Sequence, residues 1–282
     1  GQFSYFMNND TVGVGMPLRI EFSQPIKNRK AVEQNLKVTS SKPTVGAWSW
    51  ASDNQSVTFR PQTFWPANSK IKVNAALKGI QTSPGIYGER DMTAGFKTGA
   101  SMVSTVDANT LTMTVRKNGK VIRKIPVTTG KSGFETRSGI KPIMGKEGTV
   151  VMDAASGGTP VGSADYYRLT VHYSMRLTSS GEFVHAAPWS TGSQGRSSVS
   201  HGCVGMSTGN AIWLYDQSKV GDVVEVKNTG RKQDLGNGIT EWNVKWAKWL
   251  ARSKTGEQAV GPAAAKVKPP APAATTVSSV VG

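Results

Sequence analysis

The segment from residue 183 to residue 203 reads FVHAAPWSTGSQGRSSVSHGC and ends in Cys203, the only cysteine of the chain. Two of the three histidines, His185 and His201, lie in the same segment. A single cysteine cannot form an internal disulfide, so it is either a small buried side chain or a reactive thiol. The thiolate is the nucleophilic form, and a nearby imidazole can accept the thiol proton. The two histidines therefore favour a reactive thiol.

The residues around this segment are patterned as short strands joined by turns, with one helix. Residues 110–116 and 121–125 flank an Asn-Gly pair, which predicts a hairpin with a type I′ turn. Ser207 is a suitable N-cap for a short helix. Further strands are predicted at residues 148–152, 167–173, 183–185 and 222–226. These patterns indicate one β-rich domain that begins near residue 101.

The first hundred residues have the pattern of a separate antiparallel sandwich. Alternating apolar and polar residues predict strands at 18–22, 36–39, 56–60 and 70–74, with turn residues between them. One helical turn is expected at residues 28–34. Residues 1–100 contain no histidine and no cysteine, so we expect this domain to act as a spacer.

The C-terminal residues divide into a tryptophan-rich segment and a segment of low complexity. Trp242, Trp246 and Trp249 have helical spacing, which predicts a short helix that docks on the core of the second domain. Residues 252–282 are rich in Pro and Ala and have few bulky apolar side chains, so we expect a disordered tail. The predicted domains are therefore residues 1–100 and 101–251, followed by this tail.

The net charge of +16 is spread along the whole chain. Nucleic-acid-binding domains usually concentrate basic residues on one helix or stripe, so nucleic acid is not an expected partner. A diffuse excess of positive charge is compatible with attraction to anionic polymers of a bacterial wall. No run of apolar residues is long enough to span a bilayer.

A histidine, fourteen intervening residues and then Ser-His-Gly-Cys resembles the signature of L,D-transpeptidases with a YkuD-type catalytic domain. Residues 185–190, 211–216, 220–226 and the tryptophan-rich segment are similar to the actinobacterial branch of that family. The resemblance implies a mainly β fold. In it, an N-terminal immunoglobulin-like β-sandwich precedes a β-rich YkuD-type catalytic domain with a short helix and a Trp-rich C-terminal segment.

The resemblance also implies a role for each residue of the motif. Cys203 is the expected nucleophile, and His185 is the base that activates it. The backbone carbonyl of Ala186 is expected to orient the imidazole. The N–H groups of His201, Gly202 and Cys203 are expected to line an oxyanion hole, where fixed dipoles stabilise developing negative charge.

Further residues match substrate-binding positions of the family or belong to the motif. They are Met152, Tyr167, Trp189, Ser200 and Gly205. Tyr167 lies in residues 153–176, a Gly- and Ser-rich region that we name the flap and expect to act as a lid. Gly205 departs from the family pattern, which usually has Asn or Arg there, and this affects the expected recognition of the donor. His172 has no expected role and is interpreted as structural or exposed.

The resemblance implies a peptidoglycan L,D-transpeptidase that cross-links third-position diamino acids of two stem peptides through a cysteine thioester, with release of D-Ala. The alternative is an L,D-carboxypeptidase or endopeptidase that uses the same Cys203 and His185 with water as acceptor. Neither cofactor nor metal is expected. Stem peptides are the expected partners, and carbapenem-type β-lactams are expected covalent inhibitors. The expected location is extracytoplasmic, at the cell wall or the outer face of the plasma membrane, with a lipid anchor before residue 1 compatible with it.

A third hypothesis is a catalytically silent module that binds the wall through its positive charge. The intact pair of His185 and Cys203 argues against this hypothesis. It would require an unreactive thiol in a protein that still binds wall material.

Overall fold

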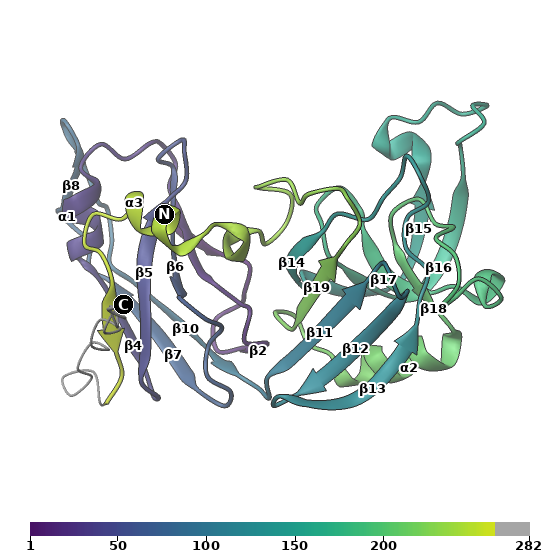
Figure 1. The fold of residues 1–282 in the computed structure, drawn as a ribbon. Coiled ribbons are helices and arrows are strands. Elements are labelled where there is room, and N and C mark those ends of the chain that lie inside the picture. Colours follow the sequence, from purple (N-terminus) through teal and green to yellow (C-terminus); the bar gives the residue numbers. More distant parts are fainter. Residues whose placement is uncertain (263–282) are drawn as a thin grey trace, which may run out of the picture.

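The computed structural model describes residues 1–262, which form two β-rich domains that lie side by side (Figure 1). The expected tail therefore lies largely outside the described residues. In the described part of the chain, no helix is long and apolar enough to cross a membrane.

The first domain is a sandwich of two sheets around one apolar core. Its sheets have the strand orders β1-β3-β6-β5-β20 and β2-β10-β7-β4. Burial alternates along β4 and β7, so one face of each strand contributes side chains such as Val38 and Val73 to the core. The elements are β1 (Gln2–Ser4), β2 (Thr11–Val12), β3 (Leu18–Glu21), α1 (Arg29–Gln34), β4 (Leu36–Ser40), β5 (Thr44–Trp50), β6 (Ser56–Pro61), β7 (Lys70–Ala75), β8 (Gln81–Ser83), β9 (Ile86–Tyr87) and β10 (Met92–Thr98).

The second domain contains a five-stranded and a four-stranded sheet, with orders β13-β12-β11-β19-β14 and β15-β16-β17-β18. A second apolar core, which includes Val106, Met113 and Val184, lies within this domain. Its elements are β11 (Met102–Asp107), β12 (Thr112–Lys117), β13 (Lys120–Pro126), β14 (Gly139–Pro142), β15 (Gly145–Asp153), η1 (Ala154–Gly157), β16 (Arg168–Arg176), β17 (Phe183–Ala186), η2 (Pro188–Ser190), β18 (Val204–Met206), α2 (Thr208–Gln217) and β19 (Val223–Lys227).

Local sequence signals of the second domain are confirmed. Asn118 and Gly119 between β12 and β13 have φ values of 51° and 82°, as a type I′ turn requires. The Ser207 side chain accepts a hydrogen bond from the N–H of Asn210 at 3.2 Å and so caps α2. The flap contains η1, a connecting loop and β16, and Figure 1 shows the β15–β16 hairpin projecting from the domain.

The two domains meet through a close contact between backbones. The N–H of Gly13 donates to Val220 at 2.8 Å, and the N–H of Gly15 donates to Gly221 at 2.9 Å. A Cβ atom on Gly13 would lie 2.0 Å from the backbone nitrogen of Asp222. Glycine is therefore required at residue 13, because any side chain would push the domains apart.

The C-terminal segment corrects the predicted boundary at residue 252. It comprises η3 (Glu241–Asn243), α3 (Trp246–Ala251) and β20 (Gln258–Val260), and it runs back across the first domain (Figure 1). β20 pairs with the edge of β5, whose unpaired N–H and C=O groups it satisfies. A strand of three residues with modest strand propensity cannot be recognised from the sequence pattern, so the sequence analysis missed β20.

The tryptophan-rich segment also docks on the first domain and not on the core of the second. Trp249 donates from Nε1 to the carbonyl of Ala47 at 2.9 Å. The guanidinium of Arg60 lies 4.7–5.3 Å from the ring centroids of Trp242, Trp246 and Trp249. Cation–π contacts with a first-domain arginine thus explain why these rings pack there.

Candidate functional site

The central part of the site is formed by two neighbouring parallel strands. β17 and β18 pair in parallel, with His185 opposite Gly205. Both strands are fully buried, and Cys203 immediately precedes β18. This pairing brings residues 18 positions apart in the sequence to adjacent strands, so the thiol and the imidazole line one cavity.

The cavity has a volume of about 360 Å³, and most of the site residues predicted from the sequence line it. Among these residues are Met152, Tyr167, His185, Trp189, Ser200, His201, Cys203 and Gly205. Ala186 and Gly202 are adjacent in sequence to lining residues but do not line the cavity themselves. The sequence analysis missed further lining residues, namely Thr128, Leu169, Ala187, Ser190, Ser193 and Val199. Most of these are small or apolar and have no chemical signature of their own.

His185 is held in the tautomer that a general base requires. Its Nδ1 lies 2.7 Å from the carbonyl oxygen of Ala186. A carbonyl only accepts, so Nδ1 carries the proton and Nε2 of the neutral ring is free to accept one. The side chain is 5% exposed, and burial lowers the pKa of His185 below its usual value. The imidazole is therefore neutral at pH 7, as expected for a proton acceptor.

Cys203 rests as a thiol in contact with the turn before β17. Its Sγ accepts a hydrogen bond from the N–H of Phe183 at 3.4 Å and donates to the carbonyl of Gly181 at 3.9 Å. Burial, together with the nearby carboxylate of Glu182, raises the pKa of the Cys203 thiol to about 12, against the opposing effects of the Phe183 N–H and of Lys141. Within residues 1–262, no hydrogen bond joins Sγ to the ring of His185. Direct transfer of the thiol proton to His185 would therefore require a change in the position of Sγ.

Two hydrogen bonds of Ser200 hold the loop that carries Cys203. Ser200 donates from Oγ to the carbonyl of Cys203 at 2.7 Å and accepts from the N–H of Gly202 at 3.2 Å. Gly202 has a φ of 129°, which side chains disfavour. The Gly202 N–H is thus already bonded, whereas the N–H groups of His201 and Cys203 have no acceptor in the described part of the chain. These two groups are the available donors for a substrate oxyanion.

Aromatic rings line part of the cavity. The ring centroid of Tyr167, from the flap, lies 4.2 Å from that of His201, and the ring centroid of Phe134 lies 5.0 Å from that of His201. Burial lowers the pKa of His201, and the nearby Lys131 lowers it further. Trp189 lies 5.9 Å from the ring of His185 and is 55% exposed, so it forms part of the rim.

Gly205 is surrounded too closely to accept a larger side chain in place. A Cβ atom there would lie 2.9 Å from both the Cβ of Ala187 and the Oγ1 of Thr128. Thr128 also exchanges two backbone hydrogen bonds with Gly205, at 2.9 and 3.0 Å. The threonine hydroxyl thus occupies space that a side chain at residue 205 would need.

His172 lies outside this cavity, consistent with the absence of an expected role. It is exposed on β16, and its Nδ1 lies 3.0 Å from the hydroxyl of Thr149. It borders a neighbouring cavity of about 600 Å³ that also includes Trp189 and Ala186.

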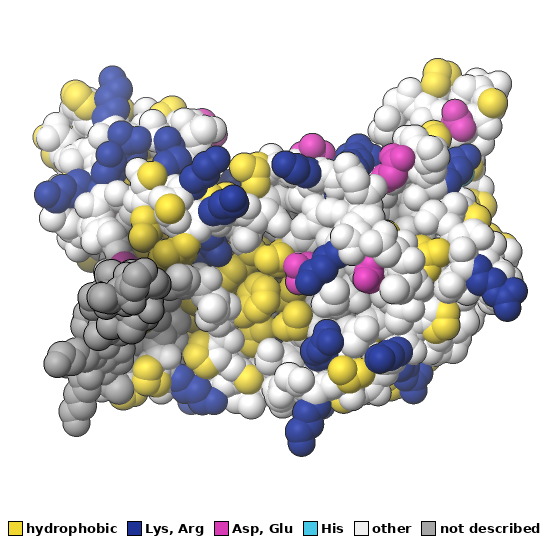
Figure 2. All heavy atoms as spheres, viewed as in Figure 1, with side chains coloured by type: hydrophobic (Ala, Val, Ile, Leu, Met, Phe, Trp, Pro, Cys, Tyr) yellow, Lys and Arg dark blue, Asp and Glu magenta, His cyan; other side chains and the backbone are white. Residues whose placement is uncertain are grey.

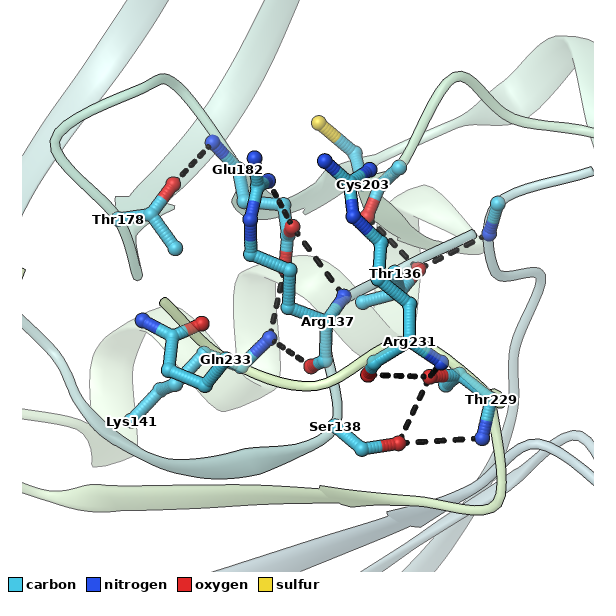
Figure 3. Close-up of polar contacts among 12 residues, drawn as sticks. Thr136, Arg137, Ser138, Lys141, Thr178, Glu182, Cys203, Thr229, Arg231 and Gln233 are labelled. Atoms are coloured by element: carbon cyan, nitrogen blue, oxygen red, sulfur yellow. Dashed lines mark hydrogen bonds and ion pairs between the residues drawn. The ribbon is translucent and has the colours of Figure 1, made fainter. Parts of the chain in front are cut away.

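A buried charged cluster behind Cys203 was not anticipated. It consists of Arg137, Lys141 and Glu182 (Figure 3). The available signal was a lysine inside the apolar run Ile140-Lys141-Pro142-Ile143. Among residues 1–262, no group of three His, Cys, Asp or Glu side chains has the arrangement of a metal site.

Comparison with known proteins identifies both domains. Residues 101–226 match the L,D-transpeptidase catalytic domain, YkuD, and residues 2–81 match a bacterial Ig domain. L,D-transpeptidase 1 of Mycobacterium tuberculosis is 38% identical to this chain, over 78% of the chain and 81% of that protein. The chain belongs to the L,D-transpeptidase family.

Other L,D-transpeptidases are similar over comparable lengths. L,D-transpeptidase 2 of Mycobacterium tuberculosis is 38% identical over 86% of this chain, which spans only 60% of that protein. The structure of LD transpeptidase LdtMt1 in complex with imipenem superposes with a TM-score of 0.68, at 37% identity, over 80% of this chain and 98% of that one. These similarities confirm the predicted fold class, an Ig-like domain followed by a YkuD-type domain.

Proposed function

We propose that the chain is a peptidoglycan L,D-transpeptidase that joins third-position diamino acids of two stem peptides through a thioester on Cys203. The observation that carries this proposal is the position of His185. Its protonated Nδ1 is fixed on the Ala186 carbonyl, and its free Nε2 belongs to the cavity that holds the only thiol of the chain. Membership of the L,D-transpeptidase family supports the reaction class.

In the first half-reaction, the Cys203 proton moves to Nε2 of His185, and Sγ attacks the carbonyl carbon between the third residue and D-Ala. The N–H groups of His201 and Cys203 donate to the resulting oxyanion. The carbon–nitrogen bond then breaks. D-Ala leaves as an amine after it takes the proton from His185, and the donor stem remains as a thioester.

In the second half-reaction, the side-chain amine of another stem attacks the thioester carbon. His185 accepts a proton from this amine, the carbon–sulfur bond breaks, and the thiol is restored. The thioester conserves the free energy of the amide bond that was broken and uses it to form the new amide, so the exchange requires no separate energy source. Water in place of the amine would give hydrolysis, the outcome of an L,D-carboxypeptidase.

The same nucleophile accounts for a proposed reaction with carbapenems. One related structure contains imipenem, and an L,D-transpeptidase 3 structure from Mycobacterium tuberculosis contains a faropenem-derived adduct. Attack of Cys203 on a β-lactam carbonyl would open the ring and leave a thioester on Sγ. The apolar and aromatic lining of the cavity provides a surface for the β-lactam core.

An extracytoplasmic location at the wall or on the outer face of the plasma membrane is part of the proposal. Figure 2 shows Lys and Arg side chains distributed over both domains, with fewer Asp and Glu among them. Attraction between such exposed charge and anionic wall polymers should weaken as salt shortens the Debye length. Co-sedimentation with isolated sacculi across a salt series tests this point, and salt-independent binding would contradict it.

The decisive test is mass spectrometry of products from purified muropeptides. The wild-type chain should give dimers linked through third-position residues, with release of D-Ala, and Cys203→Ala should give none. Shortened monomers without dimers would show hydrolysis instead of transfer. Dimers from the Cys203→Ala variant would show that another group is the nucleophile.

A further inference from the structure

Three charged side chains form a buried cluster behind Cys203 (Figure 3). Lys141 donates from Nζ to Oε1 of Glu182 at 2.6 Å, and Arg137 donates from Nη1 to Oε2 at 2.8 Å. The side chains of Lys141 and Glu182 are 0% and 4% exposed. None of the three lines the cavity of Cys203, so the cluster acts on the site without touching substrate.

The cluster fixes the turn that contacts the thiol. Glu182 donates from its N–H to Oγ1 of Thr178 at 2.9 Å and accepts from the N–H of Leu177 at 2.8 Å. Its side chain is bound on both oxygens by the two cations. The residues on either side, Gly181 and Phe183, supply the carbonyl and the N–H that contact Sγ. The position of these two groups therefore depends on Glu182.

The segment of residues 136–141, which contains Arg137 and Lys141, also binds the loop that carries Cys203. Thr136, adjacent to Arg137, donates from Oγ1 to the carbonyl of Gly202 at 2.8 Å and accepts from the N–H of Gly130 at 2.9 Å. Residues 136–141 thus bind both backbone segments that flank Cys203.

Lys141 is the cation of the cluster whose charge acts on the thiol. Arg137 is paired at 2.8 Å with both Glu182 and the exposed Asp234, so its charge is neutralised on two sides. Burial lowers the pKa of Lys141, and Arg137 lowers it too, while Glu182 and Cys203 act in the opposite direction. A buried cation is costly unless it is paired, and an anion at Cys203 would give Lys141 a second partner.

We propose that Arg137, Lys141 and Glu182 are positioning residues: Glu182, held by the two cations, keeps the Phe183 N–H against Sγ, and the buried Lys141 stabilises the ionised form of Cys203. The relevance of this cluster to catalysis rests on the proposed role of Cys203 as nucleophile. The effect of the cluster on the pKa of the thiol does not depend on that role, so the proposed function and the proposed role of the cluster can fail separately. The other ionisable groups that face the thiol are His185 from β17, His201 from its own loop and Tyr167 from the flap. All three remain unchanged in the variants below.

The test is the rate at which iodoacetamide alkylates Cys203 as a function of pH. The thiolate displaces iodide, and intact mass reports a single site because the chain has one cysteine. Below the thiol pKa, the rate is proportional to the thiolate fraction. Lys141→Met and Arg137→Met should each slow alkylation about tenfold, equivalent to a thiol pKa higher by about one. Glu182→Gln removes a negative charge and should accelerate alkylation. Lys141→Arg keeps the positive charge, so its rate should equal that of the wild type.

The matched control is Lys227→Met, which removes an exposed lysine from β19, the strand paired with β14. Its rate should equal that of the wild type. Rates ordered by the net charge of the cluster support the proposal. If Lys141→Met and Glu182→Gln shift the rate in the same direction, or neither differs from the control, the proposal is wrong. Arg137 is less buried than Lys141, so its variant keeps the test valid if Lys141→Met does not fold.

Carbapenem acylation separates this proposal from the function above. Charge-ordered alkylation without any carbapenem adduct on the wild-type chain would retain the cluster and reject the proposed enzyme. Adduct formation with equal rates in wild type, Lys141→Met and Glu182→Gln would retain the enzyme and reject the cluster.

Discussion

The two walls of the Cys203 cavity are built in opposite ways. One wall, which we name the floor, consists of β17, β18 and the loop 200–203; its two strands are buried, and hydrogen bonds hold the His185 ring and the Ser200 hydroxyl. The other wall is the flap, where Leu169 is 38% exposed and Val161 is 73% exposed. The floor fixes the reacting groups in position. The flap presents apolar surface that a bound substrate can cover.

The floor and the flap should also differ in how easily they open. The floor is bonded to its neighbours through the buried cluster and through Thr136, so its local opening should require much of the unfolding free energy. Residues 154–167 of the flap have few buried side chains and should open at low cost. Chemistry should therefore depend on floor residues, and substrate binding on flap residues.

The largest effect is expected at the nucleophile. Cys203→Ala should abolish formation of a carbapenem adduct, as measured by intact mass. The fold should remain intact, because the change removes one sulfur atom from a partly buried site. A melting temperature close to that of the wild type is the control. An adduct on the variant would show that the floor does not supply the nucleophile.

The second effect compares two histidines, one from each wall. His185→Ala should slow acylation by about 10²–10⁴-fold, the usual contribution of a positioned general base. His172→Ala, on the exposed side of the flap, should change the rate little. The rate of carbapenem acylation at pH 7 measures both. Comparable losses would mean that floor and flap share the proton transfer.

The third effect should appear in substrate binding. Tyr167→Ala removes the flap ring that lies against His201, and we expect KM to rise about tenfold with a smaller change in kcat. Val161→Ala, at an exposed flap position outside the cavity, is the matched control. Steady-state kinetics with a soluble stem peptide separates the two constants. A fall in kcat alone would assign Tyr167 to the chemistry of the floor.

Local patterns predicted much of the fold. Alternation identified β3, β4, β6 and β7, and the Asn-Gly pair identified the β12–β13 hairpin, because these signals depend on neighbouring residues alone. The motif from His185 to Cys203 predicted residues that the parallel pairing of β17 and β18 then brings into one cavity. Spacing within a motif was sufficient there.

The remaining features depend on contacts between distant residues. Lys141 and Glu182 are 41 positions apart, and nothing local indicates that they pair behind the thiol. β20 depends on the edge of β5, more than 200 positions earlier. The contact of Sγ with the Phe183 N–H depends on the conformation of a turn. The sequence could therefore single out Cys203 but not the groups that contact its Sγ.

The smallest effect on catalysis is expected at the domain junction. Ile143 follows β14, the strand of Lys141, and its N–H donates to the carbonyl of Asp222 at 2.9 Å. Asp222 is 2% exposed, and its Oδ1 has no hydrogen-bond partner among residues 1–262, with the Lys219 ammonium 3.9 Å away. Burial raises the pKa of this carboxyl from 3.8 to about 7.

The sign of the resulting pH dependence follows from this pKa. Between about pH 4 and 7 the folded chain binds more protons than the unfolded chain, so the free energy of unfolding falls as pH rises through this window. The stability advantage of Asp222→Asn over the wild type should grow by roughly 2 kcal/mol or more between pH 5 and pH 8. Urea melts at both pH values measure this, with the exposed Asp216→Asn as control. Acylation rates should be unchanged. If Asp222→Asn keeps the pH dependence of the wild type, this carboxyl is not the group that titrates. If the variant has an altered acylation rate, the domain junction does influence the residues of the floor.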